Sequence, residues 1–549
     1  MRIAGKGLSG WRPGGARPAP AYGVLVLLLI SLGASGQETD PESPDHILEE
    51  IVVEASRAGI TALDLPVNTS ILSQQDVMEL ATRPADEILR QIPGFSLLRS
   101  ADSIATAPTT ATVSMRGLGG SAASRALVLL DGIPIHSPNS SEVYWARVPK
   151  HRIERVEVVR GGGANAWGNL SLGGVINIIT APPRRNGVDF TGILSYPWTT
   201  DLSLAGSAVH ERWELNGQAS YYDTDGYYNS PDDQRGPVDE PVHKNYGSAS
   251  GKASYRLRDD TRVFITGSLF DEERHAGSAK DIDSTQIWTL GAGLEVDAAN
   301  GSQWRADLFH EDMEVEDYAT RINGDRDQET VRQFRVQPVS ATNAGLVWAR
   351  KLGGHTVTAG ADYRWTDMTV NDYEGFIDGI PFRLKTIDAS QDMGGVFIQD
   401  TWDISARWQV NGSLRYDYVT NQGSTVITGL DSGETLSEDH YEKNSESTVN
   451  PSFGLRFQPF GGLSLRAAAY KGFRAATLRE LYRSASTRLG IVLVNNPYLA
   501  PERLTGLEGG VDWNTSANTL LRATLFRNVV EDLIQNITRG SAGDDPAYV

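Results

Sequence analysis

The chain contains no cysteine among its 549 residues. This absence excludes disulfide bridges, thiolate metal sites, iron–sulfur clusters and a cysteine nucleophile. Basic residues are in the minority, since 50 Lys and Arg stand against 69 Asp and Glu and the formal net charge is −19. Nucleic-acid binding needs a basic surface that neutralises phosphates, so we predict that the chain binds no nucleic acid.

The chain also lacks a long hydrophobic run of the roughly 18 residues that a membrane-spanning helix needs. Its N-terminus is basic, with no acidic residue before Glu38, and an apolar run at residues 22–32 is followed by small residues at 34–36. This order is typical of a secretory signal peptide, which we place at residues 1–36. The alternative is a transmembrane anchor, but a helix over this run would span only about 17 Å.

Two zones of different composition follow the predicted signal peptide. Residues 37–60 are acidic and contain two prolines, which predicts a flexible tether. Residues 61–183 combine a helical hydrophobic period at 76–92, interrupted by prolines, with short apolar segments separated by glycine clusters. The apolar segments predict buried strands at residues 128–130, 156–159 and 175–180. We therefore predict a compact α+β domain in this zone.

From residue 188 to residue 549 the dominant hydrophobic period is two. In three clear runs one apolar and one polar face alternate for nine to eleven residues, at 213–221, 356–365 and 408–418. A tilted strand of this length crosses a bilayer. Aromatic residues gather at the run ends, as in the interfacial girdles of membrane barrels. The fold class that we predict is therefore mainly β, an antiparallel transmembrane β-barrel.

A soluble β-sandwich or propeller is the alternative, since its strands also alternate. Its strands are usually only about five or six residues long, which is shorter than the runs observed here. The polar face of the runs carries charged residues, which suits a water-filled lumen. We also expect the polar stretches at 223–250 and 429–448 to be long loops on one rim, as outer-membrane barrels have.

Several motifs resemble those of one protein family. Residues 113–135 (VSMRGLGGSAASRALVLLDGIPI) and 152–180 (RIERVEVVRGGGANAWGNLSLGGVINIIT) together resemble the plug domain of TonB-dependent outer-membrane receptors. The acidic tether contains EIVVEA, which resembles the TonB box of that family. Its barrel signatures are resembled by FIQDTWDIS with WQVNGSLRYDY, by YKGFRAATLRELY and by NNPYLAPERLTGLEGGVDW, at residues 397–418, 470–482 and 495–513.

The plug motif departs from the family pattern at one turn. The family has Arg-Gly-Pro followed by a Tyr-Gly pair, whereas this chain has Arg160-Gly161-Gly162 and then Trp167-Gly168. The resemblance implies a plug at 61–183 inside a barrel of twenty-two strands at 188–549. The 362 residues from 188 to 549 provide only about 15–18 strands at roughly 20–24 residues each. We therefore expect a C-terminally incomplete sequence, with a smaller barrel as the alternative.

The function implied by the resemblance is energised uptake of a scarce ligand across the outer membrane of a Gram-negative bacterium. The ligand is expected to be a ferric siderophore, with cobalamin, haem and glycans as alternatives. The implied partners are TonB with its inner-membrane energising complex, and outer-membrane lipid and lipopolysaccharide. From another class, a structural barrel or an envelope hydrolase would also fit an exported β-protein, but the plug and the TonB box argue against the former.

Catalytic motifs are absent from the sequence. The glycine-rich residues 161–168 lack the Gly-Lys-Ser/Thr of a phosphate-binding loop, and neither His-Glu-x-x-His nor Gly-x-Ser-x-Gly occurs. We therefore predict that the protein is not an enzyme and needs no cofactor. Five aspartates at residues 223–239 could hold Ca²⁺ through carboxylate oxygens, although a charged loop without metal is the simpler interpretation.

Three groups of residues are candidates for function. The TonB box is assigned to Ile51, Val52 and Val53, because these residues are apolar and β-branched within an acidic tether and have no core to join. The ligand site is assigned to two polar segments of the plug, 99–110 and 136–145. The side chains that we expect to bind the ligand are Arg99, His136, Asn139, Tyr144 and Trp145.

The third group links plug and barrel. In the resembling family, arginines that precede a glycine at the end of a plug strand pair with barrel glutamates. Arg116 and Arg160 occupy such positions, and Glu508 is their expected partner, with Glu502 and Glu480 as weaker candidates. An arginine in a desolvated lumen needs a carboxylate, since breaking such a buried pair costs about 3–5 kcal/mol.

Overall fold

The structure, a computed structural model, describes residues 53–57, 65–79, 85–99, 106–107, 110–119, 123–148, 150–161, 166–183, 185–486, 492–516 and 519–536. The predicted signal peptide and most of the predicted tether lie outside these residues. Among the described residues, no helix has both the length and the apolar character needed to cross a membrane.

A five-stranded sheet forms the centre of the N-terminal domain. Its strand order is β1-β6-β7-β4-β5, and all neighbours are antiparallel except β4 and β7. The predicted buried strands are confirmed within β4, β6 and β7, because their valines and isoleucines are nearly all buried. The bounds are β1 (Thr69–Ser73), β4 (Leu127–Leu130), β5 (Ile133–Pro134), β6 (Ile153–Arg160) and β7 (Gly174–Thr180).

The helical segment predicted at 76–92, with its break at Pro84, forms two short helices that pack against this sheet. They are α2 (Gln74–Glu79) and α3 (Ala85–Leu89), on either side of Pro84. Val77, Ile88 and Leu89 enter a core with the apolar residues of β4, β6 and β7. The remaining elements are the strand pair β2 (Phe95–Leu97) and β3 (Val113–Met115) and the 3-10 turns η1 (Glu54–Ser56), η3 (Trp145–Arg147) and η4 (Lys150–Arg152).

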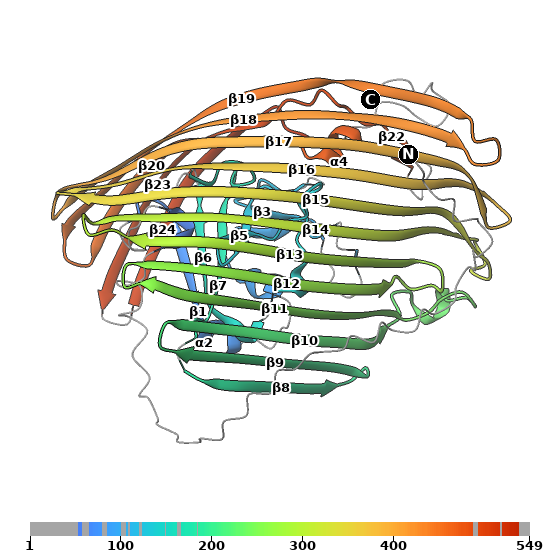
Figure 1. The fold of residues 1–549 in the computed structure, drawn as a ribbon, viewed down its shortest axis with the longest axis horizontal. Coiled ribbons are helices and arrows are strands. Elements are labelled where there is room, and N and C mark those ends of the chain that lie inside the picture. The colour runs from blue at the N-terminus through green and yellow to red at the C-terminus, as the bar shows by residue number, and fades with distance from the viewer. Residues whose placement is uncertain are drawn as a thin grey trace. The chain divides into compact units, whose positions relative to one another are not determined.

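A fifteen-stranded antiparallel sheet contains most of the chain, and its strands run side by side in Figure 1. The strand order follows the sequence from β8 to β20 and continues with β23 and β24. Its bounds are β8 (Gly187–Ser195), β9 (Thr199–His210), β10 (Trp213–Tyr227), β11 (Val242–Arg258), β12 (Thr261–His275), β13 (Ile282–Asp297), β14 (Ser302–Ile322), β15 (Glu329–Leu352), β16 (His355–Ile377), β17 (Ile380–Ser405), β18 (Trp408–Gly429), β19 (Thr435–Phe460), β20 (Leu463–Arg474), β23 (Glu502–Ser516) and β24 (Thr519–Glu531).

Turns at the two ends of this sheet differ in length. At one end, on the left in Figure 1, β9 and β10 are joined by residues 211–212 and β17 and β18 by residues 406–407. At the other end, β10 and β11 are joined by residues 228–241 and β20 and β23 by residues 475–501. The connection between β10 and β11 contains the 3-10 turn η6 (Asp232–Gln234). The connection between β20 and β23 contains the short helix α4 (Leu478–Tyr482) and the strand pair β21 (Ala485–Ser486) and β22 (Val492–Leu493).

The expectation of long loops at 223–250 and 429–448 is wrong for most of these residues. Strand β10 continues to Tyr227, β11 starts at Val242 and β19 starts at Thr435. The ladder continues because neighbouring strands extend together, so backbone groups remain paired beyond the length that a bilayer needs. The strands are therefore longer than the alternating runs that revealed them.

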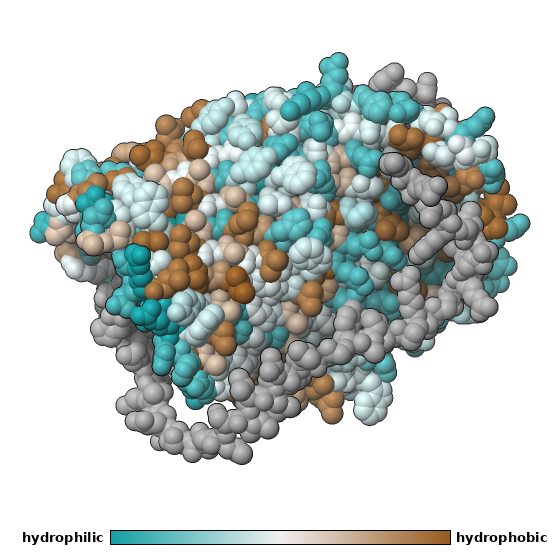
Figure 2. All heavy atoms as spheres, viewed as in Figure 1, coloured by the Kyte–Doolittle hydropathy of each residue, from teal (hydrophilic) through white to brown (hydrophobic). Residues whose placement is uncertain are grey.

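The outward side of the large sheet is apolar and aromatic. Leu269, Leu290 and Val396 are more than half exposed on their strands, and Figure 2 shows hydrophobic side chains spread over this face. Near the short-turn end, aromatic rings of adjacent strands pack together in the pairs Trp213–Tyr255, Trp304–Trp348 and Trp408–Phe457, with ring centroids 4.7, 6.2 and 4.2 Å apart. Such rings are typical of the membrane–water interface.

Candidate functional site

One buried ion pair between the N-terminal domain and the large sheet joins Arg116 to Glu508. Arg116 follows β3 with a left-handed backbone (φ 56°), and its Nη1 lies 2.6 Å from Oε2 of Glu508 on β23. The same Nη1 donates a hydrogen bond to the hydroxyl of Tyr470 on β20, at 2.7 Å. Both charged side chains are at least 97% buried. The pair predicted from the sequence is thus present in the structure, and we name it the Glu508 latch.

The position after Arg160 requires a glycine, Gly161, for two structural reasons. Its φ is +67°, and a Cβ at this position would lie 2.5 Å from the Tyr470 hydroxyl and 2.6 Å from Nη1 of Arg116. A side chain would therefore displace the groups that hold Glu508. The glycine permits both the backbone conformation and the close approach.

Arg160 does not pair with Glu508, contrary to the prediction. Its guanidinium donates to Asn68 Oδ1 and Ser70 Oγ within its own domain. Glu508 is already occupied, since it also accepts from the backbone N–H of Asn68 at 3.1 Å and lies 3.5 Å from Arg466. Burial, with the nearby charge of Arg116, lowers the pKa of Arg160 to about 10.

A second latch was not predicted. Arg125 Nε and Nη2 donate to the two carboxylate oxygens of Glu502 at 2.8 and 2.6 Å. Arg474 of β20 approaches the same carboxylate at 2.8 Å and also pairs with Glu480 of α4. Glu502 further accepts from the Ile534 backbone N–H. This group, which we name the Glu502 latch, is fully buried at Glu502 and Arg474.

Two signals in the sequence could have indicated the Glu502 latch. Arg125 stands two residues before the apolar strand β4, and Glu502 stands in the motif that led to Glu508. Arg125 precedes an alanine, so it lacks the Arg-Gly motif of Arg116 and Arg160. A third pair links the domain to β14, because Arg147 Nη2 lies 2.7 Å from Glu311.

The segment Val53–Arg57 is held against the N-terminal domain. The Ala55 N–H donates to Glu157 Oε2 at 2.9 Å, and the Ala55 carbonyl accepts from Trp167 Nε1 at 2.8 Å. The guanidinium of Arg57 lies 3.6 Å from the centroid of the Trp167 ring. We name this arrangement the Ala55 clasp.

The large sheet completes the clasp. Arg57 Nη1 lies 3.6 Å from Asp362 of β16, and Asp362 accepts two hydrogen bonds from Arg415 of β18. Burial lowers the pKa of Arg57 to about 10 and raises that of Glu157. The clasp therefore joins the start of the described chain to both the N-terminal domain and the sheet.

The TonB-box prediction assumed that its residues have no core to join. Val53 contradicts this assumption, because it is fully buried and packs with Leu129, Val159 and other apolar residues. Ile51 and Val52 lie outside the described residues. Residue type alone does not decide this, because an apolar, β-branched residue such as Val53 fits a buried core as well as an exposed tether.

The residues proposed for the ligand site are buried rather than exposed to solvent. Arg99 lies 2.5 Å from Asp86, and both side chains are at least 97% buried. His136 is enclosed, with Nδ1 donating to the Ser141 carbonyl at 2.7 Å and Nε2 accepting from the Val128 N–H at 2.8 Å. Burial lowers the pKa of His136 to about 4, so the ring is neutral at pH 7.

Asn139, Tyr144 and Trp145 are also covered. Tyr144 packs edge-on against Phe270 of β12, with centroids 6.3 Å apart, and burial raises its pKa well above the usual value. Trp145 lies in the core of the N-terminal domain. The Asn139 carbonyl accepts from the backbone N–H of Arg479, so α4 lies directly on this segment. The expectation of an open polar segment is therefore wrong for residues 136–145, because β12 and α4 cover them. Of the other segment, Arg99 is buried against Asp86, and residues 100–105 and 108–109 lie outside the described residues.

Helix α4 is well defined despite its length. Thr477 caps it, and the side chain of Glu480 returns to the Thr477 backbone to complete a capping box. Leu478, Leu481 and Tyr482 are buried against residues of β15–β17. Figure 1 shows α4 beneath β17, toward the end with the long connections.

The acidic stretch at 223–239 forms ion pairs with arginines. Asp239 pairs with Arg326, and Asp232 lies 2.5 Å from Arg235. Within the described part of the chain, no three His, Cys, Asp or Glu side chains gather as a metal site. The possible Ca²⁺ site therefore gains no support from the arrangement of these carboxylates.

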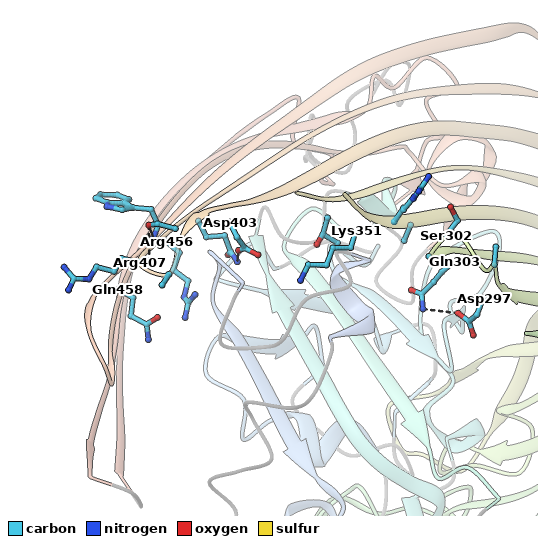
Figure 3. A pocket seen from close by; sticks show the side chains of 17 residues that line it. Asp297, Ser302, Gln303, Lys351, Asp403, Arg407, Arg456 and Gln458 are labelled. Atoms are coloured by element: carbon cyan, nitrogen blue, oxygen red, sulfur yellow. Dashed lines mark hydrogen bonds between the residues drawn. The ribbon is translucent and has the colours of Figure 1, made fainter. Parts of the chain in front are cut away.

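A cavity of about 1000 Å³ lies at the opposite end from α4, among the short turns. Its lining residues all belong to the large sheet and its turns. In Figure 3, the labelled side chains, including Asp297, Lys351, Asp403 and Arg456, come from several strand ends that curve around the opening, and Gln303 is joined to Asp297. This mixture of charges is typical of a hydrated rim.

Comparison with known families gives two matches that divide the chain as the two sheets do. The family described as "TonB dependent receptor-like, beta-barrel" matches residues 212–549, and the "TonB-dependent Receptor Plug Domain" matches residues 61–175. Among curated relatives, the vitamin B12 transporter BtuB of Vibrio cholerae is 22% identical over 484 residues, covering 85% of this chain and 69% of that relative. The iron-regulated outer membrane virulence protein of Vibrio cholerae is also 22% identical, covering 95% and 74%.

Solved structures of similar fold include a copper transporter and a siderophore receptor. The copper transporter OprC superposes with a TM-score of 0.70 at 16% identity, covering 86% of this chain and 74% of that one. The siderophore receptor PiuA of Acinetobacter baumannii gives a TM-score of 0.67 at 16% identity, covering 87% and 74%.

Proposed function

Because the chain belongs to the TonB-dependent receptors of the outer membrane, we propose that it takes up a ferric siderophore by energised gating. Family members work with TonB and are transporters or receptors rather than enzymes. The observation that carries the proposal is the Ala55 clasp, which fixes the segment that begins at the last residue of the proposed TonB box, Val53, to both domains. A structural barrel would need neither a clasped segment nor a latched plug.

The mechanism assigns a separate role to each group of contacts. The plug, residues 61–183, is held to the barrel wall by the Glu508 and Glu502 latches. Ligand arriving from the side of the long connections meets α4 and the plug segment beneath it. Binding shifts the population toward a state in which the clasp is open, and TonB then pairs with Ile51, Val52 and Val53 as an added strand.

The ligand assignment is supported by the names of similar proteins. Siderophore receptors recur among the structures of similar fold, while the curated relatives include vitamin B12 and iron-regulated proteins. Cobalamin, haem and copper are therefore the competitors. The signal peptide, residues 1–36, and contact with lipopolysaccharide belong to the same proposal.

Uptake in cells tests the proposal. Cells with this gene should accumulate iron from ferric siderophores, and cells without the gene or without TonB should not. The variant Val52→Pro removes a backbone donor and should abolish uptake while ligand binding to the purified receptor persists. The matched variant Val52→Ile keeps an apolar β-branched residue and should retain uptake. Full uptake by Val52→Pro would contradict the assignment.

A further inference from the structure

Basic side chains gather around α4 in an otherwise acidic chain. Arg479 lies within α4 and Arg483 follows directly after it, both half-buried. Lys385 of β17 donates its Nζ to the Ser484 carbonyl at 3.2 Å, next to Arg483. Burial, and then the charges of Arg335 and Arg479, lower the pKa of Arg483 well below its ordinary value.

The positive charges of Arg479 and Arg483 are not neutralised by ion pairs with carboxylates. The acids whose charges act on Arg483, Asp317 and Asp372, already pair with Arg335 at 3.0 and 3.5 Å. Glu374, whose charge acts on Lys385, lies 3.9 Å from Arg383. Among the described residues, no carboxylate oxygen lies within 4.0 Å of the guanidinium of Arg479 or of Arg483. Charged groups removed from water normally have partners, so two half-buried arginines without an ion-pair partner carry an uncompensated desolvation cost.

Tyr482 gives an independent indication of a missing partner. It lies between these arginines in sequence, is only 1% exposed, and its hydroxyl has no hydrogen-bond partner among the described residues. Its ring is 5.5 Å from that of Tyr441 on β19. A buried hydroxyl without a partner is unfavourable, and an aromatic ring beside guanidinium groups offers a flat apolar surface together with positive charge.

We propose that Arg479, Tyr482 and Arg483 bind an anionic group of the transported ligand, which is therefore a negatively charged chelate. This inference rests on the proposed function and specifies its substrate class. Arginine suits the role because its planar guanidinium donates paired hydrogen bonds to carboxylate-like oxygens. An anion there removes the repulsion between the two arginines and supplies the acceptors that they lack.

The position of α4 connects this site to the plug. The backbone of Arg479 donates to Asn139 in the plug, and Glu480 pairs with Arg474, which shares Glu502 with Arg125. An anion that displaces α4 therefore acts on contacts that reach the Glu502 latch. The site lies where ligand occupancy can bias the plug.

Binding to the purified full chain in detergent tests the proposal, read by quenching of tryptophan fluorescence. The probes are a trianionic ferric tris-catecholate and an uncharged ferric tris-hydroxamate of similar size. We expect the native receptor to prefer the anionic chelate, with an affinity that falls as salt increases. The double variant R479Q/R483Q should bind it at least about tenfold more weakly, as expected for lost charge-assisted hydrogen bonds.

Two controls separate charge recognition from other effects. R321Q removes an exposed arginine on β14 and should leave affinity unchanged. R479K/R483K keeps both charges without the planar fork, so it should fall between the native receptor and R479Q/R483Q, and it serves if the latter does not fold.

Unchanged binding of the anionic chelate by both double variants, no binding of it by the native receptor, or equal preference for the uncharged chelate would overturn the inference. TonB-dependent uptake of an uncharged siderophore would overturn it while leaving the proposed function intact. Absence of TonB-dependent uptake of any ferric siderophore would instead refute the proposed function.

Discussion

Glu502 and Glu508 each serve an arginine of the plug and an arginine of the barrel. Glu502 lies between Arg125 and Arg474, and Glu508 lies between Arg116 and Arg466. Removal of one partner leaves the others buried without compensation, which costs more than the pair itself contributes. The latches are therefore expected to fail as units.

The Glu502 latch gives the first prediction. E502Q and R125Q should each loosen the plug by about 3–5 kcal/mol, because each leaves an uncompensated buried charge. The double variant should lose less than the sum of the two, since the residues share one interaction. Hydrogen exchange of residues 123–130 in the full receptor measures the loosening, and antibiotic entry into cells reports its consequence.

A neighbouring residue provides the control. Arg503 follows Glu502 but its side chain is 46% exposed and its contact with Asp532 is at the surface. R503Q should change plug exchange by less than about 1 kcal/mol. Strictly additive effects of E502Q and R125Q would show that the two residues do not act together.

His136 predicts a dependence of plug stability on pH. Its pKa is about 4 in the folded plug against 6.5 ordinarily, because burial disfavours the charged ring. Between these values the unfolded state binds the proton more tightly, so plug stability is complete above about pH 6.5 and is lost as pH falls toward 4. The loss approaches about 3 kcal/mol.

The variant H136Q isolates this contribution. Glutamine has no titrating group in this range, so the difference in exchange-derived stability between pH 7 and pH 5 should shrink in H136Q. The native receptor at the same two values provides the comparison. An identical pH dependence in the two proteins would assign the effect to other groups.

At the scale of elements, the proposed mechanism requires the clasped segment to move. It is short, contains one 3-10 turn, and depends on Trp167 for both a hydrogen bond and the stacking of Arg57. W167L removes both contacts, with an expected cost of about 1–3 kcal/mol. The segment should then open in the absence of ligand.

The lack of cysteine makes this prediction easy to measure. Val53→Cys introduces a single thiol in a buried position. Its reaction with a maleimide should be slow in the otherwise native chain and at least about fivefold faster with W167L, because 1 kcal/mol corresponds to about that factor. W198L alters an exposed tryptophan and is the matched control. Equal labelling rates with and without Trp167 would exclude its role in the clasp.

The elements also show which features were predictable from the sequence. Period-two runs located β10, β16 and β18, because side chains that alternate between lipid and lumen leave a local pattern. The ends of these strands were not predictable, since pairing with a neighbour extends them. The covering of Asn139 by α4 also left no local pattern, because the two segments are more than 300 residues apart.

For individual residues too, what the sequence predicted was local, and what it missed depended on contacts between distant segments. Arg116 and Glu508 were paired through motifs resembling a known family, whereas Arg160 stands in an equivalent motif and bonds Asn68 instead. Motifs identify which residues are special. The choice of partner depends on which carboxylate is already occupied, and only the folded arrangement determines that.

The whole molecule has two ends that should face different compartments. The short turns are expected in the periplasm and the longer connections outside the cell. Single thiols at Ala406, in the turn between β17 and β18, and at Ser432, between β18 and β19, test this orientation. On intact cells a membrane-impermeant maleimide should label S432C and leave A406C unlabelled, and both should react in lysed cells. The reverse pattern would invert the topology.

The position of β1 determines how the plug responds to a mechanical load. Among the described strands, β1 lies at the edge of its sheet and pairs with β6 alone, and its first residue, Thr69, pairs with Val159. A pull on the chain at Val53 reaches Thr69 after the clasp and the Asn68 contacts have opened. Load applied at that end peels hydrogen bonds away one after another instead of shearing them together, so β1 separates at low force. The remaining strands β6, β7, β4 and β5 retain all their mutual pairings. Under the proposed mechanism, the plug therefore opens a passage by losing one strand and recovers by re-pairing it.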